Sequence, residues 1–106
     1  MTSPRIDALR AMVAKNPGNA LARFGLANEA AKAGLHQEAV EQFRLYLAAH
    51  DDEGNAYGRL AESLVHLGRV DEARAALRDG IAASERFGHP SMANEFEARL
   101  DELEGE

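Results

Sequence analysis

The sequence predicts an all-α protein made of stacked helical hairpins, and three of its features support this prediction. First, one unit is written twice within residues 20–86, with a period that is typical of stacked pairs of helices, about 34 residues. Second, apolar residues recur at helical spacing. Third, glycine or proline stands beside the expected helix ends. Similar residues 34 positions apart include Leu26 and Leu60, Ala27 and Ala61, Gly34 and Gly68, and Ala39 and Ala73.

The repeated residues have a physical role in a helical hairpin. Leu26 and Leu60 are expected to point into the core between two helices. The repeated alanines are small, which lets antiparallel helices approach closely, whereas larger residues would overpack the contact at a cost of roughly 1–3 kcal/mol. Gly34 and Gly68 are expected to end the first helix of each hairpin, because glycine readily adopts the left-handed conformation found just past a helix end.

The N-terminal residues predict a helix that has no partner helix before it. Ser3 is suited to cap this helix and Pro4 to its first turn. The helix should end near Lys15, because the residue before a proline disfavours helix and Asn16 precedes Pro17. The position 34 residues before Phe43 is Leu9, so this segment, residues 3–16, corresponds to the second helix of a hairpin.

Three longer helices are predicted in the middle of the chain. Asn19 is suited to cap a helix of about residues 20–33, and its partner should run over residues 36–49. Asp51 and Asp52 offer caps for the next helix, over about residues 54–67. These helices form the first hairpin and open the second.

The last two helices should depart from the strict repeat. The fifth starts near Val70 and should run on to about Phe87, where Gly88 stops it and Pro90 opens a sixth helix over residues 90–104. In strict register, polar residues would take core positions of the sixth helix. A shift of about two residues places Phe96 there instead. The carboxylates Glu95, Glu97, Asp101, Glu102 and Glu104 are then expected on a solvated outer face.

These residues resemble the pattern of the tetratricopeptide repeat family, in a small bacterial type with two full repeats and flanking half-repeat helices. The first repeat, counted from Ala20, matches at Leu26, Ala27, Gly34, Ala39 and Phe43. The second, counted from Gly54, matches at Tyr57, Leu60, Ala61, Leu64, Gly68 and Ala73. The first departs from the family pattern at Arg23, Ala30, His36, Tyr46 and Asp51, and the second at Val70, Leu77 and Glu85.

The resemblance implies one domain, residues 1–106, folded as a right-handed α-solenoid of about six antiparallel helices. If the first helix of a hairpin is A and the second is B, the order is B-A-B-A-B-A. The predicted parts are an N-terminal half-repeat helix (3–16), a first repeat (20–53), a second repeat (54–87) and a C-terminal capping helix (88–104).

The resemblance also implies that a protein or peptide partner binds in a concave groove lined by the A helices. The candidate groove residues are Phe24, Asn28, Lys32, Asn55, Arg59, Glu62 and His66. The carboxylate clamp of chaperone-binding members is not carried over, because Phe24 and Arg59 replace two of its residues. Asn28 and Arg59 are candidates to accept a carboxylate together, since arginine offers a fork of donors. Phe24 either anchors a partner or packs on the next A helix, over Gly58. The glycines inside the A helices, at 25 and 58, indicate close approach of a side chain or a ligand.

Composition excludes several other functions. The formal charge of −6 disfavours nucleic-acid binding, and the chain has no cysteine. Glu62 and His66 lie one turn apart but are too few for a zinc site, so no metal, cofactor or catalytic activity is expected. The sequence offers neither an apolar signal run nor a membrane span, which favours a cytoplasmic protein. Two alternatives to an adaptor remain: self-assembly, as a homodimer through the first helix, and service as an accessory subunit of an enzyme.

Overall fold

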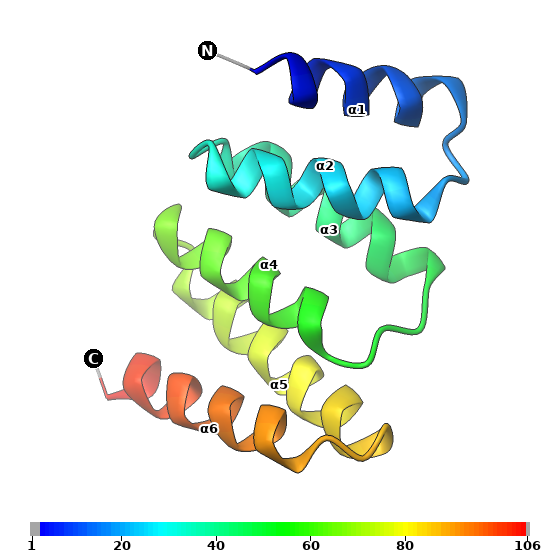
Figure 1. Ribbon diagram of the computed structural model, residues 1–106. Helices are drawn as coiled ribbons and strands as arrows, with labels where there is room; N and C mark the ends of the chain where they lie inside the picture. The colour runs from blue at the N-terminus through cyan, green and yellow to red at the C-terminus, as the bar shows by residue number, and fades with distance from the viewer. Residues whose placement is uncertain (1–2, 106) are drawn as a thin grey trace. The chain divides into compact units, whose positions relative to one another are not determined.

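The described part of the chain, residues 3–105 of a computed structural model, consists of six helices and contains no strand (Figure 1). The predicted all-α fold class is therefore confirmed. Each predicted helix is present, and each predicted end lies within one residue of the observed one. The helices are α1 (Pro4–Lys15), α2 (Ala20–Lys32), α3 (His36–Ala49), α4 (Asn55–His66), α5 (Val70–Arg86) and α6 (Pro90–Glu104).

The helices fall into two compact units that divide between His50 and Asp51. Unit 1 contains α1, α2 and α3, and α2 packs against both of the others. Unit 2 contains α4, α5 and α6, and α5 packs against both of the others. Within each unit, consecutive helices run in opposite directions (Figure 1). The division lies in the segment between α3 and α4, near the predicted limit between the two repeats.

Short side chains accept hydrogen bonds from backbone N–H groups at the starts of the helices. The hydroxyl oxygen of Ser3 accepts from the N–H of Ile6 at 3.2 Å, and the amide oxygen of Asn19 accepts from the N–H of Ala22 at 3.1 Å. A carboxylate oxygen of Asp52 accepts from two N–H groups near the start of α4, at 2.8 and 2.9 Å. The first N–H groups of a helix have no partner within it, so these bonds define where the helices begin.

Glycines in the left-handed conformation follow three of the helices. Gly34, Gly68 and Gly88 have φ angles of +80°, +74° and +77°. The N–H of Leu35 then reaches back to the carbonyl of Ala30 at 2.8 Å, and equivalent bonds follow Gly68 and Gly88. These backbone bonds satisfy carbonyls that the end of a helix leaves open. The prediction that glycine ends these helices is confirmed.

The core of unit 1 is made of large apolar side chains separated by fully buried alanines. Ala27 and Ala39, the predicted close-approach positions of this hairpin, have no exposed surface. The large buried side chains are Ile6, Leu26, Val40 and Phe43. Because Ile6 is only 2% exposed, α1 buries its main apolar residue within its own unit. The side chain of Met12 on the same helix stays 49% exposed.

The core of unit 2 confirms the predicted shift of the repeat in α6. Leu60 is buried in α4, and the buried residue that corresponds to it in α6 is Phe96, which is 36 rather than 34 positions later. Asn94 and Glu95, which would occupy core positions in strict register, are exposed. The fifth helix absorbs the shift, since it has 17 residues where α3 has 14.

Phe96 fits a space that two glycines leave open. A Cβ atom at Gly58 would lie 2.6 Å from the Phe96 ring, and one at Gly80 would lie 3.0 Å from it. Gly58 is in α4 and Gly80 is in α5, so the ring is held between both neighbours of α6. The atoms that a Cβ at Gly58 would meet first belong to Phe96 and Arg99, so α6 of the same unit makes the close approach predicted at this glycine. Packing of Phe24 over Gly58 stays a prediction.

Candidate functional site

The surface between α4 and α6 in unit 2, here called the α4–α6 face, contains two adjoining hollows. The larger has a volume of about 360 Å³ and the smaller a volume of about 230 Å³. Glu62 and Arg99 line both, so the hollows continue into each other along the helices. The larger is also lined by Ala61, Val65, His66, Leu77, Glu102 and Leu103, and the smaller by Asn55, Gly58, Arg59, Met92, Glu95 and Phe96.

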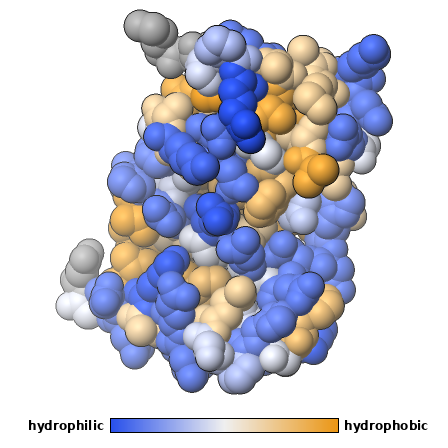
Figure 2. All heavy atoms as spheres, viewed as in Figure 1, coloured by the Kyte–Doolittle hydropathy of each residue, from blue (hydrophilic) through white to orange (hydrophobic). Residues whose placement is uncertain are grey.

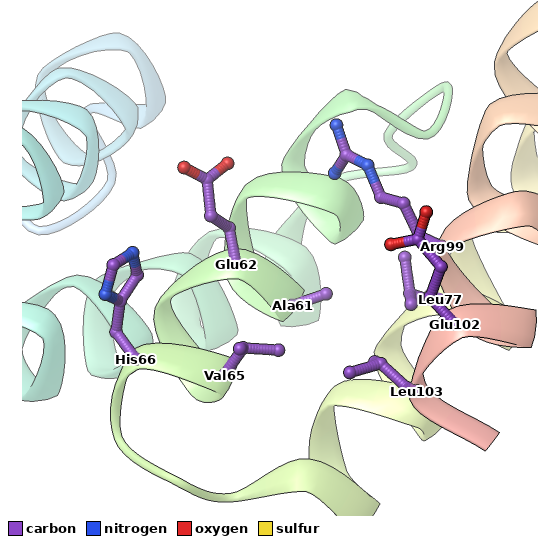
Figure 3. Close-up of a pocket in the computed structure, with 8 residues that line it drawn as sticks. All are labelled: Ala61, Glu62, Val65, His66, Leu77, Arg99, Glu102 and Leu103. Atoms are coloured by element: carbon purple, nitrogen blue, oxygen red, sulfur yellow. The ribbon is translucent and has the colours of Figure 1, made fainter. Parts of the chain in front are cut away.

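The larger hollow has an apolar floor to which all three helices of unit 2 contribute. Val65 of α4 and Leu103 of α6 point toward each other across it, and Leu77 of α5 also lines it (Figure 3). Leu77 is 1% exposed, whereas the side chain of Val65 is 42% exposed. An apolar surface open to water on one side can bind an apolar group of a partner. On the visible surface of unit 2, apolar atoms show only between larger areas of hydrophilic side chains (Figure 2).

Charged groups surround this floor, and only some of them are paired. The guanidinium of Arg99 donates to the carboxylate of Glu95 at 2.8 Å. Within residues 3–105, Glu62 and Glu102 have no ion-pair partner. The carboxylate of Glu62 extends away from the floor (Figure 3). Two uncompensated carboxylates therefore stand at the edge of an apolar surface.

All four groove residues predicted in α4 line these hollows. Asn55 and Arg59 line the smaller hollow, His66 lines the larger, and Glu62 lines both. They share one face because their positions repeat at the helical spacing of three or four residues. Their contact with a partner stays a prediction, but the structure brings them together beside residues of α6.

The predicted groove residues of α2 belong to unit 1 and have different surroundings. The half-buried ring of Phe24 packs on the rings of Phe43 and Tyr46, with centroid distances of 6.0 and 5.0 Å. The ammonium group of Lys32 lies 3.3 Å from a carboxylate oxygen of Glu29. The amide oxygen of Asn28 is buried and has no hydrogen-bond partner among the described residues. A carboxylate shared by Asn28 and Arg59 stays a prediction.

Sequence reasoning counted the sixth helix among the A helices that line the groove but named no groove residue in it. It assigned Glu95 and Glu102 to a solvated outer face, and both are exposed and also line the hollows opposite α4. A signal was present, because the two-residue shift makes Glu95 the counterpart of Arg59 and Glu102 that of His66, each 36 positions later. Arg99 lies one position away from such a counterpart, and only the structure shows that it lines both hollows.

Charge is divided unequally between the two units. Residues 1–50 contain six lysines and arginines against four acidic residues, a formal charge of +2. Residues 51–106 contain six arginines against 14 acidic residues, a formal charge of −8. Five of these six arginines form ion pairs, and Arg59 has no such partner within residues 3–105. Unit 2 is therefore strongly acidic, with one uncompensated arginine on the α4–α6 face.

Residues 3–105 contain neither a cluster of metal-ligating side chains nor a helix suited to span a membrane. No three histidine, aspartate or glutamate side chains there come together as a group that could hold a metal ion. No helix in the same range combines the length and the apolar composition that are needed to cross a membrane.

Comparison with known proteins finds a matching family model and a solved structure of similar fold. A family model described as tetratricopeptide repeat matches residues 1–83. The solution structure of a protein from Bordetella parapertussis has a similar fold, with a TM-score of 0.78 and 27% sequence identity. The similarity covers 97% of this chain and 89% of that one. No curated protein matches the sequence.

Proposed function

The chain belongs to the tetratricopeptide repeat family, and from this premise we propose that it is a non-catalytic interaction module that binds a segment of another protein on the α4–α6 face. The observation that carries the proposal is the pair of adjoining hollows, which joins an apolar floor to uncompensated charged groups. Concave sites that combine apolar surface with a few polar groups are the usual form of a binding site.

The polar residues of the smaller hollow are suited to hold the main chain or a carboxylate of the bound segment. Arg59 is exposed and offers planar donors that match a carboxylate or a peptide carbonyl. Asn55 lies one helical turn away and carries both a donor and an acceptor. Together these groups give the segment a direction, while the larger hollow accepts a side chain.

The structure favours this adaptor role over self-assembly through α1. The alternative needs an uncovered apolar surface on α1, but Ile6 is buried within unit 1 and Met12 is the large apolar residue left exposed. A homodimer remains an outcome that the following experiment separates from binding on the α4–α6 face.

The test is a peptide selection against the wild-type chain, followed by binding measurements with matched variants. Random peptides displayed on phage are selected, synthesised with a dye and titrated by fluorescence anisotropy. The variant Arg59→Ala, Glu62→Ala should weaken binding at least about tenfold, a change of about 1.4 kcal/mol. The control variant Glu41→Ala, Arg44→Ala removes the same two residue types at the same spacing from α3 and should bind as the wild type does.

Helicity and molecular mass, from circular dichroism and light scattering, must be equal in the three proteins. If selected peptides bind the first variant as tightly as the wild type, the α4–α6 face is not the binding surface. If selection yields no peptide and the mass doubles with concentration, self-assembly replaces the proposal.

A further inference from the structure

We propose that the larger hollow recognises an apolar side chain with a lysine or arginine two positions away in an extended partner segment. The apolar group would sit on the floor formed by Val65, Leu77 and Leu103, and the basic group would bind Glu62 and Glu102. The inference rests on the proposed function and adds the chemical class of the partner. Its parts are the apolar floor, the free carboxylates and the charge of unit 2.

The floor requires an apolar group because none of its three side chains can form a hydrogen bond. Val65 and Leu103 stand on either side, and the nearly fully buried Leu77 closes the bottom (Figure 3). Val65 is 42% exposed although its neighbours Ala61 and Leu64 are buried. A side chain that fills the hollow would remove this apolar surface from water, which is the main favourable term in most protein association.

The edge of the hollow selects a positive neighbour for that side chain. Arg99 is the cation of the hollow, and its guanidinium is already bound by Glu95 at 2.8 Å. Glu62 and Glu102 have no ion pair within the described chain, and they stand on the two helices that border the floor. A lysine or arginine of the partner would complete this arrangement, whereas an acidic residue would meet two like charges.

The charge of the whole unit acts in the same direction. Residues 51–106 have a formal charge of −8, so unit 2 attracts basic segments before contact. Arg59, the uncompensated arginine, lines the smaller hollow but not the larger one. The basic residue of the partner is therefore expected at the larger hollow, which Glu62 and Glu102 line and Arg59 does not.

A second copy of the chain carries related chemistry, but its geometry fits less well. Leu45 in α3 is 52% exposed and follows Arg44. Both residues are helical, and adjacent residues in a helix do not face the same surface. In an extended segment, residues two apart lie on one side, so a basic residue can follow the apolar one onto the same surface. We therefore assign the site to an extended segment rather than to α3 of another copy.

The experiment titrates the ¹⁵N-labelled full chain with three short peptides and follows backbone amide shifts by NMR. The probe is acetyl-Lys-Gly-Leu-Gly-Lys-amide, in which each lysine lies two positions from the leucine. One control replaces both lysines by glutamate, and the other replaces the leucine by serine. The probe should shift the amides of Val65, His66, Glu102 and Leu103 in a saturable way, with at least about tenfold higher affinity than either control.

Separate variants test the carboxylates and the apolar floor of the site. Glu62→Gln, Glu102→Gln should weaken probe binding about tenfold, while the matched control Glu41→Gln, Glu97→Gln, which changes exposed carboxylates elsewhere, should leave it unchanged. Val65→Thr keeps the shape of the side chain but adds a hydroxyl, so it should weaken the probe without altering the helical spectrum.

Three results of the NMR titration would overturn the inference. They are equal binding of the glutamate peptide, shifts confined to residues outside the larger hollow, and the absence of any shift with the probe at millimolar concentration. Failure of the proposed function looks different, because it is seen as phage-selected peptides that do not need Arg59 and Glu62. Selected peptides that need these residues but lack a basic neighbour would retain the function and reject this inference. Light scattering during the titration identifies binding of a second copy.

Discussion

At the scale of single residues, glycines inside helices have the clearest effect on how side chains pack. A Cβ atom at Gly58 would lie 2.6 and 2.7 Å from atoms of the Phe96 ring, closer than carbon atoms can approach without movement. The ring is 4% exposed and is also held by Gly80, so it has little room to shift. Gly25 also lies inside an A helix, but its Cβ would meet Leu9 at 3.5 Å, an ordinary contact.

We expect Gly58→Ala and Gly25→Ala to change stability in opposite directions. Gly58→Ala should lower the free energy of unfolding by roughly 1–3 kcal/mol, because the methyl group overpacks the contact with Phe96. Gly25→Ala should raise it by up to about 1 kcal/mol, because alanine favours helix over glycine and the methyl group finds space. Urea denaturation followed by circular dichroism measures both changes. A stabilising Gly58→Ala would show that the packing around Phe96 is loose.

Sequence reasoning reached part of this result. The cost of glycine within a helix indicated a close approach at positions 25 and 58, and the structure shows one at Gly58, whereas the contact of Leu9 at Gly25 is an ordinary one. The identity of that side chain was not accessible from the pattern alone. Phe24 was the evident aromatic candidate, but it packs on Phe43 and Tyr46 in its own hairpin. Local periodicity does not say which of two apolar contacts a half-buried ring will make.

At the scale of helices, the ends were predictable because their causes are local. Ser3 and Asn19 supply caps, and Gly34 and Gly68 supply the left-handed turn, each within a few residues of the helix end. The orientation of α6 was harder to predict, since it depends on a two-residue shift that spans α5. The core residue Phe96 followed from the shift, but the pattern did not show that the exposed Glu95 and Glu102 also line the hollows of the α4–α6 face.

An ion pair between distant residues ties the first helix to the third. The Nε and Nη2 atoms of Arg10 in α1 donate to the two carboxylate oxygens of Glu38 in α3, at 2.8 and 2.5 Å. The hydrogen bonds from Arg10 lower the pKa of the Glu38 carboxyl, and the same bonds raise the pKa of Arg10. Two parallel bonds of this kind fix geometry as well as charge.

This pair predicts how stability responds to acid. Because the pKa of Glu38 is lowered in the folded state, the folded chain binds fewer protons there than the unfolded chain. The stabilisation is present above the unfolded pKa, near 4.5, and is lost as the pH falls through the lower folded value. We expect Glu38→Gln to destabilise the chain at neutral pH and to reduce its loss of stability on acidification.

Urea unfolding at a series of acidic pH values measures this dependence, with Glu41→Gln on the same helix as the control. The control should retain the wild-type slope, because Glu41 is exposed and lies outside the Arg10 pair. An unchanged slope in Glu38→Gln would mean that the pair does not persist in solution.

At the scale of the whole chain, the unequal division of charge is the dominant electrostatic feature. The net charge of −6 is the sum of a formal charge of +2 in residues 1–50 and one of −8 in residues 51–106. Charged groups farther apart than about 10 Å are screened at 0.1 M salt, whereas contacts within the hollow are less affected. Salt therefore separates long-range attraction from direct contact.

We expect the affinity of the Lys-Gly-Leu-Gly-Lys peptide to fall several-fold when sodium chloride is raised from about 20 mM to about 500 mM, a range over which the screening length shortens strongly. Most of the loss should appear in the association rate, because steering by the acidic unit acts before contact. Stopped-flow fluorescence with a labelled peptide measures both rates. A salt-independent affinity would assign binding to apolar contact alone.

The glycines beside Phe96 also show that the two repeats are not interchangeable parts. The residues 34 positions before Gly58 and Gly80 are Phe24 and Tyr46, whose rings contact each other at a centroid distance of 5.0 Å. The first hairpin thus supplies aromatic volume at the two positions where the second leaves it out and receives it from α6. The ring of Phe96 therefore allows α6 to pack on the second hairpin, whereas it would clash with the aromatic rings of the first. The second hairpin and α6 have complementary shapes. Exchanging the two hairpins would therefore disrupt the fold, even though both follow the same repeat.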